Sequence, residues 1–306
     1  MRARPVYFVH PAADFLLPGG GSLVLLAVAA AFFPADRTSL AIVIGFQLSW
    51  VINWPHFSAT SWRLYATREN IRQYPLTALL VPWLVAGAAA AALASPEIVA
   101  PAFVKLFWIW SPFHFSGQTV GVTVLYLRRA GIEATRGERR VLGLAVFSTM
   151  FALLARAEAA PQTHDYFGIR YPSLGLPAWI DMAARVYTGV MAVALLACFA
   201  RWRQRAGGRV PLIVLVPAAA QYGWFVLGGA WPAFTEFVPL FHSLQYLLVA
   251  WSLQLKERKD REGRAGSAGF VWGETARWYL LNVAGGAALF WVLPRVVERG
   301  AGVSLA

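Results

Sequence analysis

The chain is a succession of long apolar runs, each closed by a short polar or basic stretch. Nine runs are visible, at about residues 6–33, 40–56, 76–94, 98–127, 141–155, 178–200, 210–231, 234–255 and 275–293. Most approach or exceed the roughly 20 apolar residues that a helix needs to cross a bilayer. Their apolar character is continuous, whereas a membrane-spanning β-strand alternates apolar and polar residues. The pattern predicts an all-α, polytopic transmembrane helical bundle of about nine spans.

The composition supports a membrane location for the whole chain. Of the 306 residues, 58% are hydrophobic and 14% charged, against roughly 45–50% and 25% in soluble domains. No polar stretch is long enough for a soluble domain, so we expect a single integral membrane domain over residues 1–306. The first run is broken by Pro11 and Pro18 and lacks a small-residue cleavage site, which favours a span with an irregular start over a signal peptide.

The positive charge is concentrated in loops. The formal net charge is +12, but the arginines lie between apolar runs, where they face anionic membrane lipid, so nucleic acid is not an expected partner. Every second loop is basic, and about 20 of the 27 Lys and Arg residues would share the face of the N-terminus. We therefore expect a multi-pass protein of a bacterial-type inner membrane, with a cytoplasmic N-terminus and the C-terminus opposite.

Three histidines lie inside apolar runs, where an ionisable residue is costly and marks a functional candidate. His114 precedes Arg128 by fourteen residues, and His242 precedes Lys256 by the same number. His56 lies twelve residues before Arg68, provided that its helix continues past Pro55. Helices that run in the same direction would place the three imidazoles at similar depth. The spacing predicts that His56, His114 and His242 converge on one metal ion.

Imidazole is a ligand for iron, copper and zinc, and each ligand needs its second ring nitrogen held by a hydrogen-bond partner. Gln118 and Gln245 follow His114 and His242 by four and three residues and share their helix faces. We expect both carboxamides to contact the cofactor, a substrate or water. His10 is a fourth candidate ligand if the start of the first span folds inward. The alternative for any one histidine is a hydrogen bond to a neighbouring helix, worth about 1 kcal/mol.

Other polar residues have simpler expected roles. Asp181 and Arg185 are four residues apart and predict an internal ion pair. Lys105 and Glu236 are expected near the outer interface. His164 lies in a polar loop, where a solvated side chain is the expectation.

The Pro55-His56 step inside a membrane helix, with histidines on later helices, resembles the Brp/Blh carotenoid oxygenases. These multi-span bacterial enzymes cleave β-carotene to retinal with histidine-bound iron. Their motif continues with glycine, an acidic residue and another histidine, whereas here Phe57, Ser58 and Ala59 follow. The resemblance implies iron and a ligand role for His56. It covers only the stretches around the three histidines, and the substrate is not carried over.

The leading hypothesis is a membrane-embedded, histidine-ligated metalloenzyme, an iron-dependent oxygenase or related oxidoreductase that acts on a lipophilic small molecule. Copper and haem are the alternative cofactors. One alternative function is a non-catalytic haem- or pigment-binding subunit of a membrane complex, because two histidines on facing helices could serve as axial ligands. The other is a small-molecule transporter, with Asp14, Gln47, Gln221 and Gln245 along its path. No Cys-x-x-Cys-His haem attachment motif or His-Glu-x-x-His zinc motif is present.

Overall fold

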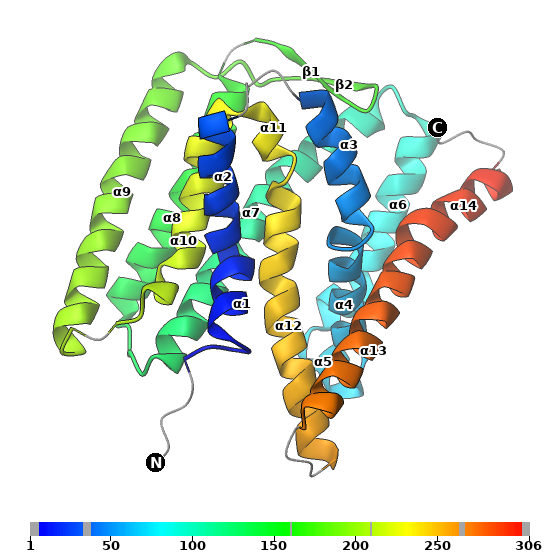
Figure 1. Ribbon diagram of the computed structural model, residues 1–306. Helices are drawn as coiled ribbons and strands as arrows, with labels where there is room; N and C mark the ends of the chain where they lie inside the picture. The colour runs from blue at the N-terminus through cyan, green and yellow to red at the C-terminus, as the bar shows by residue number, and fades with distance from the viewer. Residues whose placement is uncertain (1–5, 33–37, 160, 209, 263–266, 302–306) are drawn as a thin grey trace. The chain divides into compact units, whose positions relative to one another are not determined.

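The computed structural model describes residues 6–32, 38–159, 161–208, 210–262 and 267–301. The regular elements of these residues are helices and helical turns, apart from one short two-stranded sheet (Figure 1). Six helical segments among them are long and apolar enough to cross a membrane: Pro11–Phe32, Leu40–Tyr65, Leu76–Ala94, Arg136–Glu158, Ala178–Arg205 and Ala268–Gly300. The expectation of a helical chain with several membrane-crossing segments is confirmed, and the number nine stays a prediction.

Three expected spans fall outside these six. Helices α7 (Val99–Arg129) and α12 (Val238–Glu262) are long enough to cross a bilayer, but their histidine, glutamine and aromatic residues lower their hydropathy. The run at 210–231 is not one helix. It consists of the 3-10 turns Leu212–Val214 and Gly228–Ala230, the helix α10 (Val216–Tyr222) and a π-helical turn, Gly223–Leu227.

Contacts divide the chain into two compact units. The first comprises Met1–Tyr7 and Pro75–Trp231, and the second Phe8–Tyr74 and Pro232–Ala306. Each is described by itself below. The single domain that the composition indicates stays a prediction.

The first unit is built on three consecutive long helices, of which α7 packs on α8 (Arg136–Glu158) and α8 on α9 (Ala178–Arg205) (Figure 1). A π-helical turn, Leu76–Leu80, leads into α6 (Val81–Ala94), which contacts α7. The expected pair Asp181–Arg185 is confirmed as an ion pair in the first turns of α9.

The connection between α8 and α9 contains a β-hairpin that the sequence pattern did not predict. Strand β1 (Thr163–Tyr166) pairs antiparallel with β2 (Ile169–Pro172). Lys105 of α7 binds the hairpin to the helices. The Nζ atom of Lys105 donates hydrogen bonds to Glu158 at 2.6 Å and to the carbonyl of Pro172 at 2.9 Å. His164, expected to be solvated, is half-buried and stacks on Tyr171, with 5.2 Å between ring centroids.

The second unit begins with α1 (Pro11–Phe15), a π-helical turn (Leu16–Gly20) and α2 (Gly21–Phe32). The expected irregular start of the first span is present here. The carboxylate of Asp14 accepts hydrogen bonds from the backbone N–H groups of Phe8, Val9 and His10, at 2.6–3.1 Å. Gly19 has a φ of 146°, a conformation that only glycine adopts without strain.

The remaining helices of this unit are α3 (Thr38–Ser49), α4 (Asn53–Tyr65), α5 (Arg68–Gln73), α11 (Pro232–Thr235), α12, α13 (Ala268–Ala287) and α14 (Leu293–Ala301). A π-helical turn, Ala288–Val292, joins α13 to α14. Helix α4 packs against both α12 and α13. Their shared core contains Ala59, Leu247, Ala250 and Trp278.

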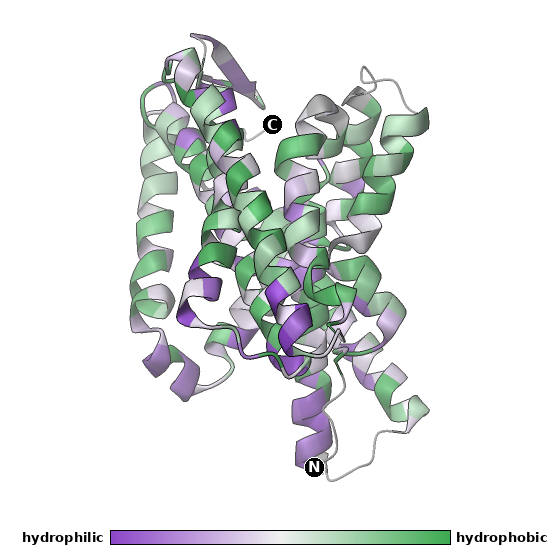
Figure 2. Cartoon of the chain, turned by 90° about the vertical axis from the view of Figure 1, so that its left-hand side faces the viewer, coloured by the Kyte–Doolittle hydropathy of each residue, from purple (hydrophilic) through white to green (hydrophobic). Residues whose placement is uncertain are grey.

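Hydrophobic residues cover the middle part of the helices in both units. Figure 2 shows hydrophobic colour over the middle of the helices and hydrophilic colour at helix ends and on the β-hairpin. Many large apolar side chains are nevertheless exposed, among them Phe32, Trp83, Ile98, Val193 and Leu280. Exposed apolar helix surfaces of this kind are typical of helices that face lipid.

Candidate metal centre

His56 lies in the first turn of a new helix. Helix α3 ends at Ser49 and α4 begins at Asn53, so the helix does not run unbroken through this region. Pro55 is the third residue of α4, a position where its missing N–H group loses no intrahelical bond. The expectation that the helix continues past Pro55 is confirmed as far as Tyr65, and a break at residues 50–52 precedes the proline. His56 keeps a backbone bond to the carbonyl of Ile52, at 3.3 Å.

His56 and His242 form a buried pair inside the second unit. Their side chains lie on α4 and α12, their exposed fractions are 4% and 2%, and their ring centroids are 5.1 Å apart at 74°. The hydroxyl of Ser243 lies 2.8 Å from Oδ1 of Asn53 and donates to it, which ties the two helices beside the rings. The pairing of these helices therefore fixes the positions of both imidazoles.

Tyr246 completes the surroundings of the pair. It lies four residues after His242 on the same face of α12. Its ring meets that of His56 edge-on, with 4.7 Å between centroids and an interplanar angle of 88°. Sequence reasoning missed this residue, although its spacing from His242 is the signal that could have found it.

The glycine doublet of α13 brings that helix close to α4 beside His56. A Cβ atom at Gly286 would lie 2.6 Å from the carbonyl carbon of Trp54, and one at Gly285 would overlap the hydroxyl of Ser58. Small residues at helix contacts allow close approach in membranes. These glycines were also missed, although a doublet in an apolar span is a recognisable packing signal.

His114 lies in the first unit, near the middle of α7 and two residues after Pro112. The proline cannot donate to the carbonyl of Trp108, which locally weakens the helix. The hydroxyl of Ser116 bonds to the Pro112 carbonyl at 2.8 Å. His114 is more exposed than the other two histidines and is followed along the helix by Gln118, which is half-buried.

A buried polar network holds α7 on the side of Ser116. Gln221 of α10 is fully buried; it accepts a hydrogen bond from Thr119 at 3.0 Å and donates to Ser116 at 2.8 Å and Thr149 at 3.3 Å. The network thus joins α7, α8 and α10. Gln221 was expected on a transport path, and in the structure its amide is engaged with these three side chains.

His56, His114 and His242 form a group of three histidines that could hold a metal ion. His114 belongs to the first unit, so the pair of His56 and His242 is the part of this group whose geometry lies within one unit.

The remaining predicted site residues have other surroundings. His10 is exposed and is the N-cap of α1, where its Nδ1 accepts a hydrogen bond from the N–H of Ala12 at 3.3 Å. The Gln245 amide donates to the carbonyl of Pro18 at 2.6 Å, at the irregular turn of the first span. A ligand role for His10, and cofactor contacts by Gln118 and Gln245, stay predictions.

Comparisons with family models, curated proteins and solved structures find no match to this chain.

Proposed function

We propose that the chain is a membrane-embedded metalloprotein whose metal ion is held by His56, His114 and His242. The observation that carries the proposal is the buried pair of His56 and His242, whose ring centroids are 5.1 Å apart, and His114 is the third histidine of a group that could hold a metal ion. Imidazole ligands suit iron, copper and zinc. Iron is the metal favoured here, because the Pro55-His56 step resembles a family that uses histidine-bound iron.

The proposed reaction is the oxidation of a lipophilic small molecule by dioxygen. Three protein ligands leave coordination positions open, as catalytic metal sites require. A cavity of about 170 Å³ in the second unit has an almost entirely apolar lining that includes Leu17, Leu25, Phe241 and Leu244. Phe241 and Leu244 place this cavity on α12, the helix that carries His242, and it would receive an apolar fragment of the substrate. The substrate would arrive from the lipid of a bacterial-type inner membrane.

The haem-binding alternative rests on the matching depth of His114 and His242, whereas the pair that lies within one unit, His56 and His242, does not have the geometry of two axial ligands. Two axial imidazoles on opposite faces of a haem would have ring centroids about 6 Å apart, because each nitrogen lies about 2 Å from the metal. The centroids of His56 and His242 are 5.1 Å apart and the rings meet edge-on. This arrangement favours two neighbouring ligands on one ion.

The transporter alternative loses part of its support as well. Discontinuous helices in transporters present free backbone groups to a substrate. Here the carbonyl of Pro18, at the break in the first span, accepts a hydrogen bond from Gln245, and Asp14 accepts three backbone N–H groups just before it. The irregular start of the span is therefore stabilised by the protein itself.

Elemental analysis and an optical spectrum of the detergent-purified full-length protein test the proposal. We expect about one equivalent of iron, without a Soret band, in the wild type. His56→Ala, His114→Ala and His242→Ala should each lose most of it, since each removes one of few ligands. His164→Gln is the matched control, because it replaces a histidine outside the group and should keep its metal. A strong tetrapyrrole absorption, or equal metal content in all variants, would contradict the proposal.

His10→Ala separates three protein ligands from four. Retention of the metal in this variant would exclude His10 as a ligand. Screening of lipophilic substrates under oxygen follows once the metal is established, with the metal-free His242→Ala protein as the blank.

A further inference from the structure

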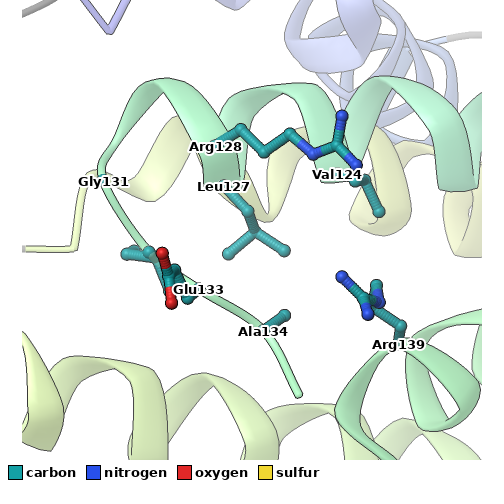
Figure 3. Close-up of a pocket in the computed structure, with 8 residues that line it drawn as sticks. Val124, Leu127, Arg128, Gly131, Glu133, Ala134 and Arg139 are labelled. Atoms are coloured by element: carbon teal, nitrogen blue, oxygen red, sulfur yellow. The ribbon is translucent and has the colours of Figure 1, made fainter. Parts of the chain in front are cut away.

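The C-terminal end of α7 is basic, and it carries a pocket that is not part of the proposed metal centre. It has a volume of about 500 Å³ and lies where α7 turns into α8. Arg128 and Arg139 line it, together with the apolar side chains of Val124, Leu127 and Ile132 (Figure 3). A pocket with guanidinium groups and an apolar wall has two kinds of recognition surface side by side.

The walls of the pocket are fixed by the backbone. The N–H of Ile132 bonds to the carbonyl of Leu127 at 2.9 Å, and that of Gly131 to the carbonyl of Arg128 at 3.2 Å. This is the Schellman pattern of a helix end, and Gly131 has the positive φ, 73°, that the pattern requires. The shape of the turn is therefore set before any ligand arrives.

The other end of the turn is equally constrained. Thr135 and Glu138 form a reciprocal capping box at the start of α8, and Glu138 also binds Arg205 of α9, at 2.7 and 2.8 Å. The buried carboxylate of Glu138 is therefore paired with Arg205, an arginine that does not line the pocket. Within the described residues, neither Arg128 nor Arg139 forms an ion pair with a carboxylate.

The charges around the pocket are arranged asymmetrically. Figure 3 shows the guanidinium groups of Arg128 and Arg139 on one side and the carboxylate of Glu133 across from them. Arginine forms short, charge-assisted and often bidentate bonds to phosphate oxygens. Glu133 would repel an anion, so a ligand must be held on the arginine side.

From this geometry we infer that the pocket binds a phosphate-bearing anion, with Arg128 and Arg139 as its ligands and the apolar wall against its organic part. An anionic phospholipid headgroup and a free phosphate compound share this chemistry. The inference does not rest on the metal centre, since none of the three histidines lines the pocket.

Binding of short-chain phosphatidylglycerol, short-chain phosphatidylcholine and inorganic phosphate to the full-length protein in neutral detergent tests the inference. Arg128→Gln with Arg139→Gln should weaken binding of the anion about tenfold or more, since two charge-assisted contacts are lost. The matched control is Arg136→Gln with Arg140→Gln, which removes the same charge from exposed residues of α8 outside the pocket lining and should leave affinity within about twofold.

The ligands separate the two sources. Binding of phosphatidylglycerol, but not inorganic phosphate, supports a lipid headgroup; saturable binding of inorganic phosphate supports a free phosphate compound. Glu133→Gln should tighten binding of either anion, because it removes a negative charge from the pocket lining. This test remains valid even if the arginine variants do not fold. Equal loss in the two double variants, or unaltered affinity in the variant of Arg128 and Arg139, would overturn the inference.

Discussion

At the scale of single residues, buried polar side chains decide how α7 is held. The side chain of Gln221 reaches Ser116, Thr119 and Thr149 from α10. Replacement of one such residue in a membrane costs about 1 kcal/mol on average, because the remaining hydroxyls find other partners. Here Ser116 and Thr149 already donate to carbonyls of their own helices, so the loss should stay in that range.

Gln221→Leu is accordingly expected to lower the free energy of unfolding by about 1 kcal/mol, measured as a lower midpoint of thermal denaturation in detergent. Gln204→Leu, at an exposed position of α9, is the control and should change the midpoint little. A midpoint unchanged in both variants would show that the network does not stabilise the unit.

Individual residues also show what could be read from the sequence. His56, His114 and His242 could be identified because an imidazole in an apolar run is rare, and their spacing from basic residues indicated a common depth. The contact between Asn53 and Ser243 could not, since small polar residues are ordinary in membrane helices. Their role depends on which helix faces which, and hydropathy does not encode this.

At the scale of elements, the contact between α4 and α13 determines where His56 lies. Gly286 has no room for a side chain, with the Trp54 backbone 2.6 Å from its would-be Cβ, whereas Gly273 on the same helix has nothing within 4 Å. A methyl group at Gly286 must push the helices apart or distort them, at a cost of about 1–3 kcal/mol. A displacement of α4 would carry His56 with it.

Gly286→Ala should therefore lose both thermal stability and metal content. Gly273→Ala should keep its metal and gain up to about 1 kcal/mol of stability, because alanine is the better helix former. Thermal denaturation and metal analysis of the two purified variants check the pair. Full metal content in Gly286→Ala would mean that the close contact does not position the histidine.

The helices and strands also show which structural features the apolar pattern predicts and which it does not. Continuous apolar runs predicted most of the long helices, but several helices extend beyond the runs: α12 ends at Glu262 where 255 was expected, and the last candidate span begins at Ala268 where 275 was expected. The apolar pattern of residues 210–231 did not predict that Gly223 lies in a π-helical turn and that Gly228 and Gly229 lie in a 3-10 turn. The hairpin of β1 and β2 was not predicted, because the hydrogen bond between Lys105 and Glu158 beside it joins residues that are far apart in the sequence.

At the scale of the whole molecule, the distribution of arginines predicts the orientation in the membrane. Within the first unit, α9 is 28 residues or about 42 Å long, with the hairpin before its start and the basic residues Arg201, Arg203 and Arg205 at its end. The positive-inside rule predicts a cytoplasmic location for the basic end and an outside location for the hairpin.

Accessibility of introduced cysteines checks the orientation. The chain has one cysteine, Cys198, which is buried, and Cys198→Ser provides the background. Phe167→Cys, at an exposed position of the hairpin, should react with a membrane-impermeant maleimide in intact cells. Arg203→Cys should react only after lysis. The reverse pattern would place the N-terminus outside the cytoplasm.

X-ray absorption spectroscopy of the purified, metal-loaded protein tests the proposed metal centre, because it counts the imidazoles bound to the metal. We expect three histidine nitrogens at about 2.0–2.1 Å in the wild type and two in His114→Ala reconstituted with the same metal. A porphyrin signature, or a histidine count that does not change in His114→Ala, would contradict a centre formed by His56, His114 and His242.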